Sequence, residues 1–555
     1  MADQIRASKD ALTAKIHRGD GAALLAFDYA EAEVADLAGF AIHWKGPGAS
    51  GGWVMNRKSF TVPVTQDTQV RRWFPTDEAP IQKFRWTHFP PVVKRGRYRY
   101  TVTARLFSGA KLRDGPSVDL ALDLLEDGHA RFELGFTRGY VSSQGYAERF
   151  HNAPIRPAKK SLDFDTRPFE ARWSWLGYHA RRMLFDFLDA CRKDPKVTVD
   201  LFAYDLDEPA FVKALESLGP RLRAFLDDSS RHVVATAIEP EARRRLEASA
   251  GAANVRTGHF QRFAHDKVLI QRRGGVPKRV LTGSANFSLR GLYVQSNSVI
   301  VIDDPEVVQR YAEAFDVAFA NPKSPAKFEG APIAKRWFPF RKPGLPDLQV
   351  SFAPHASAEV SLRQVADEID AADSSVLYAV MELGGTGPVL EKLRALATSR
   401  DRYSYGITQS LSGDLAVDGG DGSRPSVVPF SFLEKTVPKP FRAEYSGGQG
   451  QVIHHKFVVL DFNDSDPVVF CGSSNLAKGG EEENGDNLLA IRDRTIATAY
   501  AVEAIRLIDH YRFRAVLQKA TKAAPLLLEK KDGRWWQRFY RPGSLGETER
   551  RLFVR

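Results

Sequence analysis

Two stretches of the chain decide its fold. Residues 265–288 read HDKVLIQRRGGVPKRVLTGSANFS, and residues 454–477 read HHKFVVLDFNDSDPVVFCGSSNLA. His, Lys, Gly, Ser and Asn recur in the same order, and every pair is separated by 189 positions. The recurring residues with polar side chains are His265, Lys267, Ser284 and Asn286 in the first stretch and His454, Lys456, Ser473 and Asn475 in the second. A constant offset without a gap indicates an internal duplication.

Each stretch predicts a β-hairpin. His-x-Lys opens a run of β-branched and other apolar residues, a turn follows, and a second run ends at Gly-Ser-x-Asn. Side chains two positions apart on a strand share a face, so His265 and Lys267 project together while Asp266 points away. The return strand would bring the amide of Asn286 beside them. The second stretch predicts the same arrangement.

The duplication extends beyond the hairpins. Residues 199–218 resemble residues 375–396, and strand-like and helix-like patterns alternate in both halves. This alternation predicts two copies of one α/β unit, at about 170–320 and 355–515. Fused copies suggest pseudo-two-fold symmetry, with one site where equivalent surfaces meet.

The chain before the duplication follows a different pattern. The opening residues, MADQIRASKDALTAKIHRGD, predict a short amphipathic helix. A series of strand-like runs follows, and the last of them covers residues 130–136. Short strands separated by turn signals predict an antiparallel β-sandwich. The polar, proline-containing stretch 141–168 is expected to be a linker.

Four segments follow from these patterns. We expect a β-sandwich of immunoglobulin or fibronectin type at 1–142, α/β repeats at 143–330 and 331–530, and an aromatic and basic tail at 531–555. The tail interleaves Trp535, Trp536, Phe539 and Tyr540 with arginines. Such a composition suits base stacking or a lipid interface, but docking onto the body as a structural clasp is favoured.

Composition points to anionic partners. The chain has 555 residues and a formal net charge of +11, which favours nucleic acid or anionic phospholipid. Two cysteines, Cys191 and Cys471, exclude a disulfide framework. Without a secretory leader or a long apolar run, a cytoplasmic location is expected, and signal-independent export stays open. The sandwich could mediate protein contacts, and the oligomeric state is open.

The duplicated residues suit phosphodiester chemistry. Two lysines and two asparagine amides can hold the phosphoryl oxygens, whose negative charge grows in the transition state. One imidazole can attack phosphorus while the other protonates the leaving oxygen. Because no cluster with metal-ligand spacing accompanies the motif, we expect neither a metal nor a cofactor.

HxK followed by GSxN, twice in one chain, resembles the HKD signature of the phospholipase D superfamily. The resemblance covers about 170–515 and implies a covalent phosphohistidine intermediate, no metal, and hydrolysis or transfer to an alcohol. The family's HxKxxxxD aspartate is present as Asp461, but Arg272 stands at that place in the first copy. The acidic residue that usually follows GSxN and supports the histidine is Asp486 in the second copy, where the first has Asn297.

These departures predict a division of labour between the histidines. A carboxylate favours the charged form of an imidazole, so Asp486 is expected to keep His454 protonated as the general acid. His265, beside neutral Asn297, would stay neutral, as a nucleophile must. Families with two fused copies often use the first histidine as the nucleophile, which agrees.

Three functions compete at this stage. The basic charge favours a nuclease acting on DNA or RNA. The single-chain architecture also suits a phospholipase D or a phospholipid headgroup transferase. An inactive binding module is the third possibility, and the intact histidines and lysines of both copies argue against it. A long basic groove above His265 and His454 would favour nucleic acid, and a pocket with an apolar rim would favour lipid.

Overall fold

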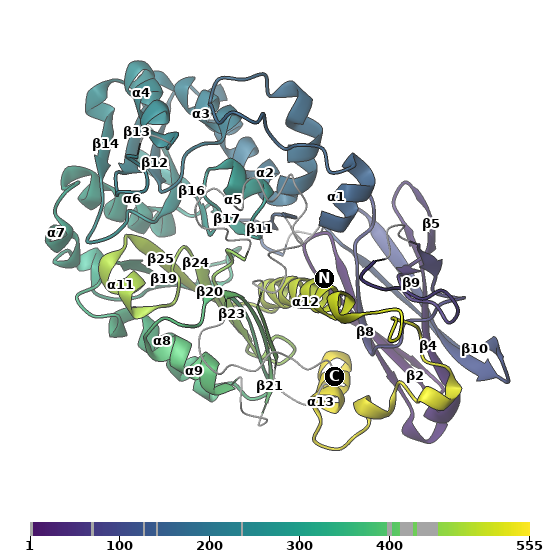
Figure 1. Ribbon diagram of the computed structural model, residues 1–555. Coiled ribbons are helices and arrows are strands. Elements are labelled where there is room, and N and C mark those ends of the chain that lie inside the picture. Colours follow the sequence, from purple (N-terminus) through teal and green to yellow (C-terminus); the bar gives the residue numbers. More distant parts are fainter. Residues whose placement is uncertain are drawn as a thin grey trace.

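The computed structural model of the protein comprises an N-terminal β-sandwich, two α/β repeats and a C-terminal tail (Figure 1). It describes residues 4–67, 72–125, 128–139, 143–234, 237–396, 402–410, 426–429 and 453–555.

The predicted sandwich is confirmed. One antiparallel sheet has the order β1-β2-β3-β8 and the other the order β10-β9-β4-β5. The strands of the first sheet are β1 (Gln4–Lys9), β2 (Leu12–Arg18), β3 (Ala23–Tyr29) and β8 (Arg85–His88). Those of the second are β4 (Leu37–Gly46), β5 (Ala49–Trp53), β9 (Arg97–Ser108) and β10 (Lys111–Asp123). Along β9, Tyr98 and Tyr100 are buried while Arg97 and Arg99 face solvent, as a period of two requires.

The predicted N-terminal helix is wrong, because its residues form the hairpin β1–β2. Leu12, Ala14 and Ile16 are fully buried on one face of β2, which is strand periodicity. Lys15 is also buried, and its Nζ donates to Asn463 Oδ1 at 2.6 Å. A contact with a residue so distant in sequence leaves no local signal.

The two repeats share one sheet topology, as the duplication predicted. The first sheet has the order β11-β17-β16-β15-β12-β13-β14, and the second the order β18-β19-β25-β24-β23-β20-β21-β22. The first set is β11 (Phe132–Phe136), β12 (Val197–Ala203), β13 (Leu222–Asp227), β14 (Val255–Gly258), β15 (Lys267–Arg273), β16 (Val276–Gly283) and β17 (Ser298–Ile302). The second is β18 (Phe338–Phe340), β19 (Asp347–Ala353), β20 (Ser375–Glu382), β21 (Tyr403–Ser410), β22 (Ser426–Pro429), β23 (Phe457–Leu460), β24 (Val468–Gly472) and β25 (Asp486–Arg492). Apart from β18, the strands correspond one to one.

One strand that was expected in the sandwich belongs to the sheet of the first repeat. β11 pairs antiparallel with β17 and takes the place that β19 takes in the second sheet. Assigning residues 130–136 to the sandwich was therefore wrong. The expected linker is also structured, since it contains helix α1 (Ser143–Phe150) and Ile155 accepts a hydrogen bond from Trp173 Nε1.

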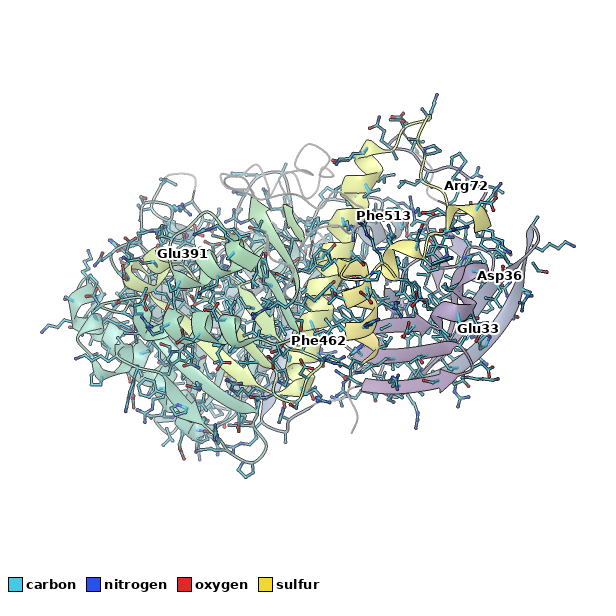
Figure 2. The ribbon with its side chains drawn as sticks, turned by 90° about the horizontal axis from the view of Figure 1, so that it is seen from below. Glu33, Asp36, Arg72, Glu391, Phe462 and Phe513 are labelled. Carbon is cyan, nitrogen blue, oxygen red and sulfur yellow. The ribbon has the colours of Figure 1, made fainter. Side chains whose placement is uncertain are left out.

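Helices cover the two sheets, and one helix of the second repeat packs against the sandwich. The longer helices are α2 (Glu170–Lys193), α4 (Glu239–Ala250), α6 (Pro305–Ala320), α8 (Glu359–Ala371) and α12 (Arg494–Lys519), and the shorter ones include α3 (Pro209–Glu216), α5 (Leu289–Tyr293), α9 (Pro388–Leu396) and α11 (Lys478–Glu483). Figure 2 shows α12, which carries Phe513, standing between the repeats and the sandwich. None of the helices in the described ranges has the length and apolar character of a membrane span.

The tail docks onto the body, as favoured from its composition. Trp535, Phe539 and Tyr540 lie in the hydrophobic core of the sandwich. Trp535 Nε1 donates to the carbonyl of Leu37 at 2.9 Å, and the Tyr540 hydroxyl donates to the carbonyl of Tyr29 at 2.6 Å. Helix α13 (Leu545–Val554) follows and packs beside β3.

Candidate active site

Two antiparallel hairpins carry the duplicated motif. β15 pairs with β16 and β23 with β24, which confirms the predicted hairpins. Gly283 and Gly472, which open the two GSxN segments, have φ of 141° and 150°. A Cβ at Gly283 would lie 2.3 Å from the carbonyl oxygen of Ser298, and one at Gly472 would lie 2.4 Å from that of Asn487. Only glycine lets the motif pass this close to the next strand.

The two repeats meet at the histidines. Phe263 forms a parallel bridge with Asn484, and Ser296 forms one with Ile453. The residues that precede each histidine therefore run beside the end of the other repeat. Two hydrogen bonds follow from this: His265 Nδ1 to Asp486 Oδ1 at 2.7 Å, and His454 Nδ1 to Asn297 Oδ1 at 2.9 Å.

This crossed pairing corrects the expectation from sequence. We expected Asp486 to support His454 and Asn297 to support His265, each within its own copy, and the structure shows the opposite. The amide of Asn297 is fixed by its Nδ2, which donates to the carbonyl of Gly291 at 2.8 Å. Its Oδ1 therefore faces His454, whose Nδ1 must carry the proton of that hydrogen bond.

The two serines stabilise the GSxN segments through hydrogen bonds, whereas Asp461 lies away from the histidines. Ser284 Oγ donates to Asn297 Oδ1 at 2.8 Å, and Ser473 Oγ accepts from the backbone N–H of Asn487 at 2.9 Å. Asp461 directly follows β23, at the end opposite His454, and accepts backbone N–H groups of residues 373–375. Its expected supporting role in the site is therefore wrong, because the carboxylate instead holds the turn before β20.

The lysines and amides surround the histidines. Lys456 Nζ donates to the carbonyl of His454 at 2.9 Å, and Lys267 Nζ donates to the carbonyl of His265. Asn286 donates to Asp205. The Oδ1 atoms of Asn286 and Asn475 are buried with no hydrogen-bond partner within the described ranges. Unpartnered buried polar atoms are expected where a ligand completes the site.

Burial sets the charge state of the site. His265 is 6% exposed and His454 is 3% exposed. Burial, followed by the nearby lysines, holds the pKa of both imidazoles well below the ordinary value. Burial also lowers the pKa of Lys267 to about 8 and raises that of Asp486 to about 7. The two lysines repel each other here, so a bound phosphate anion would be attracted to both.

A family model described as "Cardiolipin synthase, PLD-like domain" matches residues 186–318 and 365–508, one segment in each repeat. The chain belongs to the phospholipase D superfamily. Membership supports a phosphodiester-acting enzyme and leaves nucleic acid and phospholipid as alternative substrates. No curated protein matches the chain significantly.

Several solved structures match parts of the chain at low sequence identity. Polyphosphate kinase from Porphyromonas gingivalis matches with 13% identity and a TM-score of 0.38, and the match covers 60% of this chain and 49% of that one. Phosphatidylserine synthase from Haemophilus influenzae matches with 12% identity and a TM-score of 0.39, covering 59% and 84%. The phospholipase D family member Nuc from Salmonella typhimurium matches with 24% identity and a TM-score of 0.22, covering 26% and 88%.

The first repeat adds polar residues to the phospholipase D motif that sequence reasoning missed. His232 Nδ1 donates to Asp227 at 2.7 Å, and its Nε2 donates to Asp205 at 3.0 Å. Asp227 also accepts the backbone N–H of Ala264, next to His265, and Asp205 accepts from the amide of Asn286 at 2.7 Å. His232 thus links two parts of the site.

One signal in the sequence could have revealed Asp205. Val268 pairs with Phe202, and the corresponding Phe457 pairs with Ala379, so Asp205 and Glu382 occupy equivalent positions. An acidic residue at this place in both repeats is a detectable pattern. No comparable pattern marks His232.

Asp205, His232 and Glu239 could each offer one ligand atom to a metal ion, within 4.8 Å of one another. Burial alone would lower the pKa of His232, but the hydrogen bonds to Asp205 and Asp227 outweigh it and raise the pKa to about 10. A protonated imidazole has no lone pair for a cation. The geometry therefore fits a charged link between two carboxylates better than a metal centre.

Proposed function

We propose that the protein is a metal-independent phosphodiesterase that acts on DNA or RNA through a covalent phosphohistidine on His265. The observation that carries the proposal is the crossed pairing, in which His265 has a carboxylate partner and His454 has a neutral amide. Burial holds the pKa of both imidazoles low, so the partners decide which ring can better bear a positive charge during the reaction.

His265 suits the nucleophile. Asp486 accepts the Nδ1 proton, so the lone pair needed for attack lies on Nε2. Attack on phosphorus gives the ring a positive charge, and the Asp486 carboxylate stabilises that charge. His265 is also the nucleophile expected from the sequence, but its partner is the carboxylate of Asp486 and not the amide of Asn297.

His454 suits the general acid. The pKa of His454 is low in the empty site, so the phosphodiester anion must favour its protonated form on binding. An amide oxygen stabilises an imidazolium less than a carboxylate does, so the protonated His454 then gives up its Nε2 proton readily. In the first step the Nε2–P bond of His265 forms, the P–O bond breaks, and the proton of His454 passes to the leaving oxygen. In the second step His454 takes a proton from water, the water oxygen bonds to phosphorus, and the bond to His265 breaks.

Lys267 and Lys456 stabilise the phosphoryl oxygens in both steps. Both ammonium groups act on both imidazoles, and we expect the Asn475 amide and the second amide N–H of Asn286 to add neutral donors. Such fixed donors in a buried site act on the charge that develops in the transition state.

Nucleic acid is the proposed substrate because the chain carries a net charge of +11. Phospholipid hydrolysis or headgroup transfer is the second candidate, supported by the cardiolipin synthase in the description of the matching family model. An inactive binding module is disfavoured by the complete set of histidines, lysines and asparagines.

Histidine variants test the mechanism. His265→Asn should abolish adduct formation on every substrate. His454→Asn should lower the rate about 10²–10⁴-fold for substrates with alkoxide leaving groups. The rate on bis(p-nitrophenyl) phosphate should fall much less, because its leaving group needs little protonation. The first turnover of this variant should leave a phosphohistidine on His265, measurable by rapid quench and peptide mass spectrometry. The assignment of roles would be reversed by an adduct on His454 in the His265 variant together with no adduct on His265 in the His454 variant.

Parallel substrate assays test the nucleic-acid proposal. Oligonucleotides should be cleaved, with binding that weakens linearly on a log–log plot against salt concentration as counterions are released. Phosphatidylcholine and phosphatidylglycerol vesicles should be poor substrates at equal phosphate concentration. Rapid headgroup release without nucleolysis would favour the lipid alternative.

A further inference from the structure

A large cavity lies apart from the two histidines. It occupies about 1210 Å³ between the sandwich, α1, α12 and the tail, and its described lining contains none of the duplicated histidines, lysines or asparagines. We propose that this cavity is a second binding site, which holds single-stranded nucleic acid by base stacking and phosphate contacts. The inference rests on the proposed function, because it assumes that the substrate is a nucleic acid.

Aromatic rings dominate the apolar part of the wall. Five of the nine tryptophans of the chain line the cavity, namely Trp44, Trp53, Trp73, Trp86 and Trp175. Phe89 and Phe513 join them, the latter from α12 (Figure 2). Trp53, Trp73 and Phe89 are 36%, 40% and 38% exposed, so ligand bases can reach their rings. Stacking on such rings is sequence-tolerant, since every base has an aromatic face.

The polar part of the wall is strongly basic. Nine arginines and lysines line the cavity within the described residues, against three acidic side chains. The arginines are interleaved with the rings: the guanidinium of Arg57 lies 4.9 Å from the ring centre of Trp73, and that of Arg138 lies 5.1 Å from that of Trp175. Guanidinium groups held on aromatic faces can contact phosphate oxygens or stack on bases.

The shape and chemistry favour a nucleic-acid strand over a lipid. The volume exceeds the roughly 300–1,000 Å³ of pockets that hold one small molecule. An acyl chain would need mainly aliphatic walls, but rings outnumber aliphatic side chains here. The aliphatic members in the described lining are Val54, Met55, Pro90, Pro91, Val516, Leu526 and Leu545.

The inner wall is connected to the catalytic site. Arg506 lines the cavity, pairs with Glu503, and donates to the carbonyl of Thr137 at 3.3 Å. Thr137 Oγ1 accepts the backbone N–H of Asn297 at 2.9 Å, and Asn297 is the partner of His454. The cavity therefore lies behind the seam between the repeats and is linked to His454 through these hydrogen bonds.

A binding measurement with matched variants tests the inference. The probe is a fluorescein-labelled 20-mer of deoxythymidine, and every protein carries His265→Asn to prevent turnover. Trp53→Ala combined with Trp73→Ala should raise the Kd about tenfold or more, because each ring removes a stacking contact. Val233→Ala combined with Val276→Ala, at exposed apolar positions outside the lining, should leave the Kd within twofold.

Charge variants supply a second comparison. Lys58→Gln with Arg149→Gln, both in the wall, should weaken binding and reduce the salt slope by about 2. Lys327→Gln with Arg341→Gln, outside it, removes the same charge and should have a much smaller effect. Folding of each variant is checked by its free energy of unfolding.

The outcomes separate the cavity from the reaction. If the tryptophan pair, in an otherwise active chain, loses oligonucleotide cleavage but retains bis(p-nitrophenyl) phosphate hydrolysis, both proposals stand. Unchanged oligonucleotide binding in the tryptophan and charge variants would overturn the proposal that the cavity binds nucleic acid, while leaving the proposed function intact. Binding that depends on the cavity without nucleolysis would overturn the proposed function alone. Phosphatidylglycerol vesicles that bind through the same tryptophans, with no binding of the oligonucleotide, would assign the cavity to lipid and overturn the inference.

Discussion

Replacing Asp486 by asparagine should slow phosphohistidine formation by about 30- to 1,000-fold. Asp486 Oδ1 lies 2.7 Å from His265 Nδ1, and the carboxylate is fully buried. Two unit charges about 4 Å apart interact by about 4 kcal/mol at an effective dielectric constant near 20. If the ring carries half to all of its charge in the transition state, the loss is about 2–4 kcal/mol, which gives that range of rates.

The pH dependence provides a second signature of the same contact. Burial raises the pKa of Asp486 to about 7, so the carboxylate is increasingly protonated below that pH. A neutral carboxyl cannot stabilise the charge on His265, so the rate of adduct formation should rise with pH until about 7. It should fall again above about 8, where Lys267 loses its charge. Asp486→Asn should lose this rise, because asparagine does not titrate.

The assay is the burst of p-nitrophenolate from bis(p-nitrophenyl) phosphate, followed by rapid quench across pH 5–9. Asn297→Asp is the matched variant, because it places a carboxylate beside His454 instead. That change should stabilise the protonated acid and slow only substrates with poor leaving groups. A normal burst with Asp486→Asn, or an unchanged pH profile, would refute the argument that this carboxylate supports the nucleophile.

Four further outcomes are expected. Activity on bis(p-nitrophenyl) phosphate should survive excess EDTA, and a loss that Mg²⁺ restores would contradict the mechanism. His232→Gln should lower kcat by up to about 10²-fold, because it releases segments that position the site, whereas His259→Gln, at a half-exposed contact with Asp228, should change it little. Burial lowers the pKa of His17 and of His88 to about 3, so both stay neutral in the folded chain while the unfolded chain binds protons below pH 6.5. Lowering the pH to 4.5 should therefore reduce the free energy of unfolding by about 3 kcal/mol for each histidine. Urea titrations of His17→Gln should show a weaker dependence of this free energy on pH. Trp535→Ala should cost about 3–5 kcal/mol in the same titrations, and a loss below 1 kcal/mol would mean that the tail is dispensable to the sandwich.

Local patterns were enough to predict the hairpins and the duplication. The alternation around His265 and Lys267, and the turn before Gly283, are properties of neighbouring residues. The offset of 189 positions then implied two equivalent units. These features depend on periodicity and turn chemistry, which a single sequence records.

Contacts between distant segments could not be predicted in the same way. Which carboxyl or amide faces which histidine depends on how the repeats dock, and the bridge between Phe263 and Asn484 decides it. A strand-like run at 130–136 reveals a strand but not its sheet. The contact of Lys15 with Asn463, in the other half of the chain, likewise leaves no local signal in the sequence.

The docking of the tail has a consequence for how the protein is made. The last strand of the sandwich ends at Asp123, yet Trp535 and Tyr540 complete its core. Translation at about 5–20 residues per second would leave the nascent sandwich waiting for roughly 20–80 s with part of its apolar interior uncovered. The ribosome delivers those aromatic side chains only when both repeats have already emerged. The first domain in the sequence is therefore among the last whose hydrophobic core is completed. Chaperones have their longest opportunity to bind it during that interval.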